Sequence, residues 1–172
     1  MNPTVTDDIS VKAKLLRRLE ENRSQLRAAL DGLTEDEISN LPAVGDWTIK
    51  DTVGHISYWE QRIHDFVTQT FTEGKPHKLT EADSNQDLNE REAAKRKKWS
   101  WTRVRAEFEN TRQALIQRVN DLSAANLEFQ IPSPWWNEER FITVARLING
   151  ANIHCREHIE EIEKWKSARQ TP

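Results

Sequence analysis

The sequence contains five histidines, and two of them stand four positions apart late in the chain. Because successive helical residues are about 100° apart, His154 and His158 would project from neighbouring turns of one helical face, close enough to bind one metal ion. On a helical wheel His158 falls within the apolar stripe and His154 at its edge, so both rings are expected to face inward. The pair predicts a metal site or, alternatively, two core-edge histidines satisfied by backbone carbonyls or by Glu161.

A third histidine, His55, flanks the apolar stripe of another predicted helix in the same way. Three neutral imidazoles from two helices would leave a Zn²⁺ or Ni²⁺ ion with an open position for water, a thiolate or a substrate. The preceding Gly54 costs about 1 kcal/mol relative to alanine inside a helix, which indicates close approach of a neighbouring helix or a ligand. His55 therefore strengthens the metal interpretation of the later pair.

The elements that must position these histidines are predicted to be helices. Five glycines and six prolines leave few chain reversals, and 31% charged with 36% hydrophobic residues is typical of long helices that each expose one face. A capping-box pattern at Thr48 and Asp51 marks the start of the helix that carries His55. A short helix is expected over 34–40, a long loop over 74–86, and a break near Ser100. The apolar spacing predicts four long helices, with no β-sheet, over about 7–31, 48–73, 88–121 and 141–165.

Composition limits the class of protein. The net charge is -3 and there is one cysteine, so a disulfide scaffold is excluded and a reduced, cytoplasmic setting is expected. No apolar run is long enough for a membrane span or a signal peptide. The locally basic run Arg91–Lys98 is interspersed with glutamates and lacks the spacing of a DNA-binding motif, which favours a solvated helix face and no nucleic-acid partner. We expect one domain over residues 1–172, an all-α four-helix bundle.

Two carboxylates are candidates for a catalytic role. Asp51 lies one turn before His55 and could orient its ring, although capping by Thr48 explains it equally well. Glu161 lies one turn beyond His158 and could hold the tautomer of a ligand or act as a base, or it could be an exposed glutamate. The single cysteine, Cys155, is expected to pack in the core. Aromatic and amide side chains could line a substrate mouth or close the bundle end, and these candidates are Tyr58, Trp59, Trp135, Trp136 and Asn137.

Two segments of the sequence resemble a known family. The run Gly45–Glu60, GDWTIKDTVGHISYWE, together with His154–Ile159, HCREHI, resembles the DinB-like four-helix bundle superfamily over about residues 11–165. The resemblance implies an up-down-down-up bundle with one divalent metal ion held by His55, His154 and His158. Within the superfamily the chain looks most like the ClbS/DfsB-type members. Relatives include thiol-dependent transferases and isomerases, metal-dependent hydrolases, and proteins that protect cells from reactive natural products.

Two functions follow as hypotheses. The first is a metal-dependent hydrolase or a thiol-dependent transferase that acts on a small electrophilic molecule with water or a low-molecular-weight thiol as nucleophile, because no side-chain nucleophile is well placed. The second is a metal-independent small-molecule binding or self-protection protein of ClbS/DfsB type. The expected partner is a small-molecule substrate, and the resemblance is also compatible with a homodimer.

Overall fold

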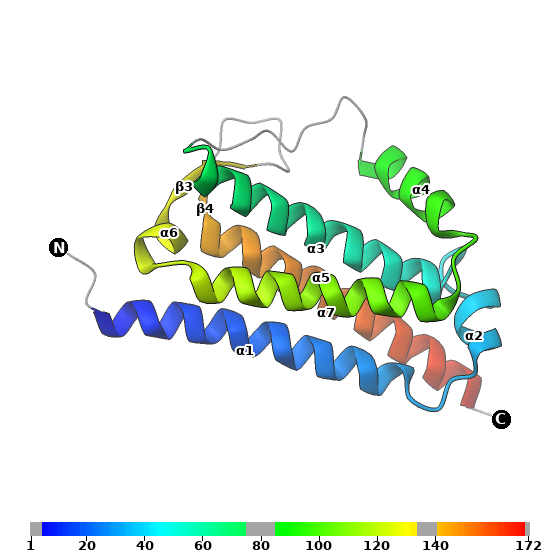
Figure 1. Ribbon diagram of the computed structural model, residues 1–172. Coiled ribbons are helices and arrows are strands. Elements are labelled where there is room, and N and C mark those ends of the chain that lie inside the picture. The colour runs from blue at the N-terminus through cyan, green and yellow to red at the C-terminus, as the bar shows by residue number, and fades with distance from the viewer. Residues whose placement is uncertain (1–4, 75–84, 134–140, 171–172) are drawn as a thin grey trace.

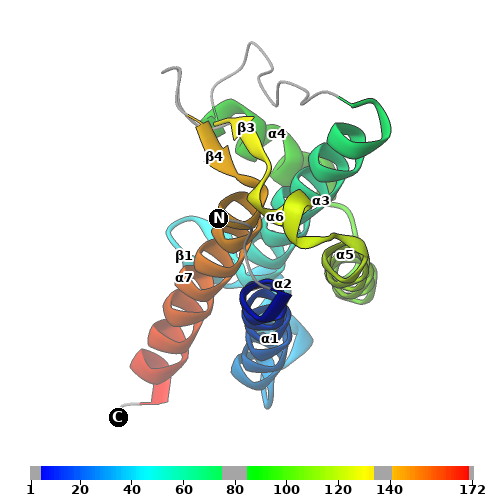
Figure 2. The same cartoon turned by 90° about the vertical axis from the view of Figure 1, so that its left-hand side faces the viewer.

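The computed structural model describes residues 5–74, 85–133 and 141–170 of the chain. Within them, α1 and α7 run in one direction and α3 and α5 in the other, so the predicted up-down-down-up arrangement is confirmed (Figure 1). The view turned by 90° shows α1 between α5 and α7, and α3 packs against the same two helices on the far side (Figure 2). The four long helices are α1 (Val5–Leu30), α3 (Ile49–Thr72), α5 (Trp101–Asp121) and α7 (Val144–Gln170).

The helix starts follow the polar caps in the sequence. The Thr48 side chain accepts a hydrogen bond from the Asp51 backbone N–H, and the Asp51 carboxylate accepts one from the backbone N–H of Thr48, which completes the predicted capping box. Ser100 caps α5 through the backbone N–H of Arg103. The region expected to be helical over 88–121 is therefore divided into α4 (Asn85–Arg96) and α5.

The expectation that β-structure is absent was wrong at the two ends of the bundle. The strands β1 (Pro42–Val44) and β2 (Trp47–Thr48) form one antiparallel ribbon, and β3 (Gln130–Pro132) and β4 (Phe141–Thr143) form another. Strands of two or three residues are too short to display a period-two pattern, so the sequence did not reveal them. The second ribbon also delays the last long helix, which begins at Val144 and not near Phe141.

The short helices α2 (Glu35–Asn40) and α6 (Ala124–Glu128) complete the described elements. The core has two clusters, one near each end of the bundle. One is built around Leu19, Phe66, Leu115 and Leu147, and the other around Leu26, Ile56, Phe108 and Ile162. Between them along the helices lie buried polar side chains, among which are Glu60 and Arg112. The histidines considered next lie beside the second cluster, His55 buried and His154 and His158 partly buried. None of the described helices is both long enough and apolar enough to cross a membrane.

Candidate metal centre

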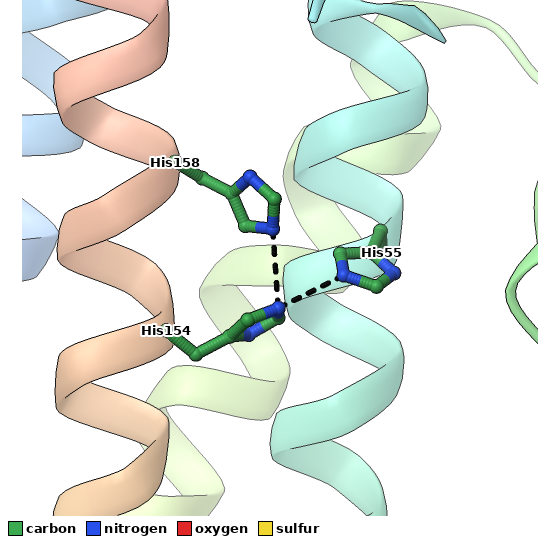
Figure 3. A group of neighbouring side chains, drawn as sticks. All are labelled: His55, His154 and His158. Atoms are coloured by element: carbon green, nitrogen blue, oxygen red, sulfur yellow. Dashed lines mark hydrogen bonds between the residues drawn. The ribbon is translucent and has the colours of Figure 1, made fainter. Parts of the chain in front are cut away.

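The three predicted histidines meet in the space between α3 and α7. His55 projects from α3, and His154 and His158 project from successive turns of α7 toward it (Figure 3). One nitrogen of each ring lies within 4.8 Å of those of the other two. The rings are close to perpendicular, with interplanar angles of 65°, 86° and 79°. The juxtaposition that the sequence predicted is therefore present, although residues 55 and 154 are 99 positions apart.

Hydrogen bonds among the rings cannot satisfy all three Nε2 atoms. His154 Nε2 lies 2.9 Å from His55 Nε2 and 3.1 Å from His158 Nε2. A neutral imidazole nitrogen carries either one hydrogen or one lone pair, so a single Nε2 cannot make two full hydrogen bonds in these directions. At least one of the three nitrogens lacks a full protein partner. Ligand nitrogens about 2.1 Å from a tetrahedral ion are about 3.4 Å apart. To surround one ion, the two short pairs would lengthen by a few tenths of an ångström, and the third pair, now up to 4.8 Å apart, would close by as much as about 1.4 Å.

The surroundings keep the rings in the form that binds metal. Burial, together with the charges that His154, His158 and Arg96 would carry nearby, lowers the pKa of His55 to about 2. Burial and His158 also lower the pKa of His154 to about 4. Both rings are therefore neutral at pH 7, and a neutral imidazole is the form that coordinates a metal ion. A donor set of three imidazole nitrogens fits a divalent transition metal such as Zn²⁺ or Ni²⁺.

Glu161 is positioned to orient one of these rings. Its Oε2 lies 2.7 Å from Nδ1 of His158, and the Glu161 side chain is 48% exposed. A carboxylate at this position accepts the Nδ1–H hydrogen bond, which leaves the lone pair of the neutral ring on Nε2, facing the cluster. In β2, Trp47 packs edge-on against His55 with ring centroids 5.0 Å apart and restrains that ring. The sequence argument had not singled out Trp47.

A pocket of about 290 Å³ opens beside the histidines. It is lined by residues of α3, α4 and α7, namely His55, Trp59, Glu60, Ile63, Asn85, Asn89, Gly150, Ala151 and His154. The indole N–H of Trp59 donates to Asn89 Oδ1 at 2.9 Å, which joins α3 to α4 across the pocket. A small molecule bound there would lie directly against two of the three histidines, so the cluster and the pocket together form one candidate site.

The pocket wall includes a buried carboxylate that the sequence argument missed. Glu60 forms a two-pronged ion pair with Arg112 of α5: Arg112 Nε donates to Glu60 Oε2 at 2.9 Å, and Nη2 donates to Oε1. The Arg112 side chain is 0% and the Glu60 side chain 1% exposed. The third Arg112 nitrogen, Nη1, donates to the backbone carbonyl of Leu19. The sequence signal was a glutamate and an arginine at inward-facing positions of their apolar stripes.

The other candidate residues lie elsewhere. The hydrogen bonds of Asp51 described above go to Thr48, so the structure shows its capping role, and a catalytic role stays a prediction. Tyr58 accepts a hydrogen bond from Arg62 and borders a separate groove between α3, α4 and α5. His64 pairs with Asp65 and is not part of the cluster. The remaining candidates fall outside the described residues, namely Trp135, Trp136 and Asn137.

Cys155 and the basic run were expected to be structural, and the geometry refines both. Cys155 is fully buried, and burial raises the pKa of its thiol to about 11, so it is no nucleophile at neutral pH. Lys95, Lys97 and Lys98 are exposed, as a solvated face requires. Arg96 differs, because it is buried, paired with Glu92 and Glu107, and packed over Gly54, where a Cβ would lie 2.8 Å from its Cδ. The neighbour that Gly54 accommodates is thus an arginine side chain.

Three solved structures share this fold. Sibling lethal factor precursor DfsB is 18% identical with a TM-score of 0.78, covering 94% of this chain and 98% of its own. The colibactin self-resistance protein ClbS in complex with double-stranded DNA is 14% identical with a TM-score of 0.72, covering 90% and 94%. The mycothiol-dependent maleylpyruvate isomerase is 12% identical with a TM-score of 0.71, covering 88% of this chain and 60% of its own.

No protein of curated function matches the sequence. At these identities the solved structures establish the fold alone. The DNA in the ClbS complex belongs to that protein, so the expectation that this chain has no nucleic-acid partner stays a prediction. The family itself is established by the sequence, because the DinB superfamily model matches residues 18–162. The chain belongs to the DinB superfamily.

Proposed function

We propose that the protein is a metal-dependent enzyme, either a hydrolase or a thiol-dependent transferase, that acts on a small electrophilic molecule bound in the pocket beside the histidines. The observation that carries the proposal is the convergence of one ring nitrogen from each of three histidines, within 4.8 Å of one another. His55, His154 and His158 would hold one Zn²⁺ or Ni²⁺ ion. Such an ion, with an open position, lowers the pKa of bound water or of a thiol and so supplies a nucleophile at neutral pH.

The chain's own residues would orient a metal ligand and form the pocket that binds the substrate. Glu161 holds the proton on Nδ1 of His158 and thereby fixes the direction of its Nε2 lone pair. Trp59 forms a wall of the pocket and is fixed there by Asn89. Cys155, a buried thiol at neutral pH, is excluded as a covalent nucleophile. The attacking group therefore comes from water or from a free thiol, and the mycothiol dependence of a structurally similar isomerase supports the thiol case.

Metal analysis tests this proposal most directly. Purified protein dialysed against Zn²⁺ or Ni²⁺ is expected to retain about one ion per chain, and His158→Ala far less. His64→Ala is the matched control, because that histidine pairs with Asp65 outside the cluster and its loss is expected to leave metal content unchanged. Equal metal content in wild type and His158→Ala would refute the assignment.

The alternative function is metal-independent binding of a reactive small molecule. It is supported by the contacts of 2.9 Å and 3.1 Å among the histidines, either one of which is also compatible with a hydrogen bond between neutral rings. Structural likeness to the colibactin self-resistance protein is in line with this role. The two functions separate on chelation. In the enzyme case, chelation abolishes conversion of electrophilic substrates, with and without added thiol; in the binding case, binding of the small molecule persists after chelation.

A further inference from the structure

Two glycines inside long helices have opposite surroundings. A Cβ added at Gly54 of α3 would lie 2.8 Å from the side chain of Arg96, so packing requires the glycine. A Cβ added at Gly150 of α7 would meet nothing within 4 Å. Glycine in a helix interior is unfavourable relative to alanine, and neither a turn nor a close neighbour offsets that cost at Gly150. What Gly150 does provide is space, since it lines the pocket beside the histidines.

The size of that pocket indicates the size of its occupant. A buried apolar cavity of about 150 Å³ accommodates benzene. The present pocket, at about 290 Å³, is nearly twice as large. Trp59 supplies a flat wall, and Ile63 and Ala151 supply aliphatic walls. Gly150, in the same lining, contributes no side chain. A planar group of two fused rings matches this volume and these walls.

The charges around the pocket indicate that the bound group is neutral. None of the described lining residues is a lysine or an arginine, and the one carboxylate, Glu60, is already paired on both oxygens with Arg112. An anionic group in the pocket would lie near that carboxylate with no free cation beside it, and burial of an unpaired charge is strongly unfavourable. Asn85 and Asn89 offer amide groups at the α4 side, which suit a neutral polar substituent.

We propose that this pocket binds an uncharged, planar, two-ring portion of the substrate and that Gly150 determines how large that portion can be. The inference rests on the proposed function, in which the pocket is the substrate site. It concerns only the part of the molecule that lies away from the histidines. The proposal places no constraint on the reacting group, which lies beside the histidines.

Binding of model compounds to metal-free protein tests the proposal. The protein is treated with a chelator and titrated by calorimetry with 2-naphthamide, with 2-naphthoate, which has the same shape and a negative charge, and with benzamide. Wild type is expected to bind 2-naphthamide at least about tenfold more tightly than 2-naphthoate, because the carboxylate would be buried without a partner. Comparable affinity for the two naphthalene compounds would overturn the neutral-ligand proposal without using any variant.

Two substitutions at Gly150 test the size limit. Gly150→Ala is expected to raise the midpoint of thermal unfolding and to weaken 2-naphthamide only slightly, whereas Gly150→Leu weakens it by about tenfold or more and benzamide much less. Arg146→Leu is the control, since it adds the same side chain to an exposed position of α7 outside the pocket. Undiminished binding of 2-naphthamide by a folded Gly150→Leu would disprove the role of Gly150. Because the protein is metal-free, these results stand apart from the metal analysis that tests the proposed function.

Discussion

Two groups of polar side chains inside the bundle differ in how fully they are paired: the ion pair of Glu60 with Arg112 between α3 and α5, and the three histidines between α3 and α7. The ion pair is complete: both carboxylate oxygens accept from the guanidinium, and a further nitrogen donates to Leu19. The histidines are incomplete, because three Nε2 atoms face one another and no arrangement of their hydrogens gives each a full partner.

This difference separates a structural polar group from one that is suited to bind a ligand. Buried groups that satisfy one another have no remaining capacity for an exogenous partner. Groups that converge with lone pairs facing one another are stabilised by a cation. Hence we expect the ion pair to control the stability of the bundle and the histidine cluster to control its response to metal and to pH.

The largest effect is expected from breaking the ion pair. Arg112→Met leaves Glu60 buried without its partner and should lower the free energy of unfolding by about 3–5 kcal/mol. Urea denaturation measures this change. The double variant Arg112→Met with Glu60→Leu removes both charges and is expected to recover most of the lost stability. If the double variant is no more stable than the single one, the pair is not the structural element that we infer.

Metal should stabilise the bundle only through the histidines. With free Zn²⁺ or Ni²⁺ at about 100 times its dissociation constant, the free energy of unfolding should rise by about 2.7 kcal/mol. Thermal unfolding with metal and with chelator measures the difference in wild type and in His158→Ala, which should not respond. His64→Ala serves as the control that keeps the response. A metal-induced shift in His158→Ala as large as in wild type would show that the ion binds elsewhere.

Acid should destabilise the metal-free protein through the same cluster. The pKa values of His55 and His154 are lowered to about 2 and about 4, whereas unfolded histidine titrates near 6.5. As the pH falls, the unfolded state therefore takes up protons before the folded state does. The contribution of the neutral histidines to the free energy of unfolding is present above about pH 6.5 and is lost as the pH falls toward the folded pKa values. Between pH 7 and 5 the loss should be on the order of 2 kcal/mol per histidine.

Urea denaturation in the presence of a chelator, at several pH values, measures this loss of stability. His154→Gln carries no titrating ring and is expected to show a shallower pH dependence than wild type. The matched variant His64→Gln is expected to follow wild type, because His64 lies outside the cluster. Identical slopes for wild type and His154→Gln would contradict a buried, neutral His154.

The smallest effect on stability is expected at Glu161. Glu161→Gln alters a side chain that is 48% exposed, so the free energy of unfolding of metal-free protein should change by less than about 0.5 kcal/mol. Metal affinity should nevertheless fall by about 10–100-fold, because the neutral amide of glutamine is a weaker acceptor than the carboxylate that orients His158. Competition with a chromophoric chelator measures that affinity. Glu163→Gln, an exposed change on the same helix, is the control, and equal affinities for the two variants would exclude the positioning role of Glu161.

Much of the scaffold was predictable because periodicity and caps are local signals. The capping box at Thr48, the break at Ser100 and the inward faces of α3 and α7 all follow from residues within a few positions of one another. The meeting of His55 with His154 required the family resemblance as well, since no local rule pairs helices 99 positions apart.

Partners across the bundle were not predictable in the same way. Helical spacing places Glu60 and Arg112 on inward faces, but it does not say that the two charges meet. Arg96 was expected on a solvated face, yet it lies buried over Gly54 because two glutamates neutralise it there. The two β-ribbons at the ends of the bundle were missed because their pairing depends on contacts between separate short strands. In each case the deciding contact is between elements and not within one.

The placement of the candidate ligands on α3 and α7 affects when the centre can form during synthesis. α7 is translated after the other three long helices, so a nascent chain that has already assembled α1, α3 and α5 still lacks two of the three histidines. An ion held by the cluster would then tie residues 99 positions apart, a cross-link of the kind that most restricts an unfolded chain. Metal acquisition would therefore follow docking of the last helix and would hold that helix in place afterwards.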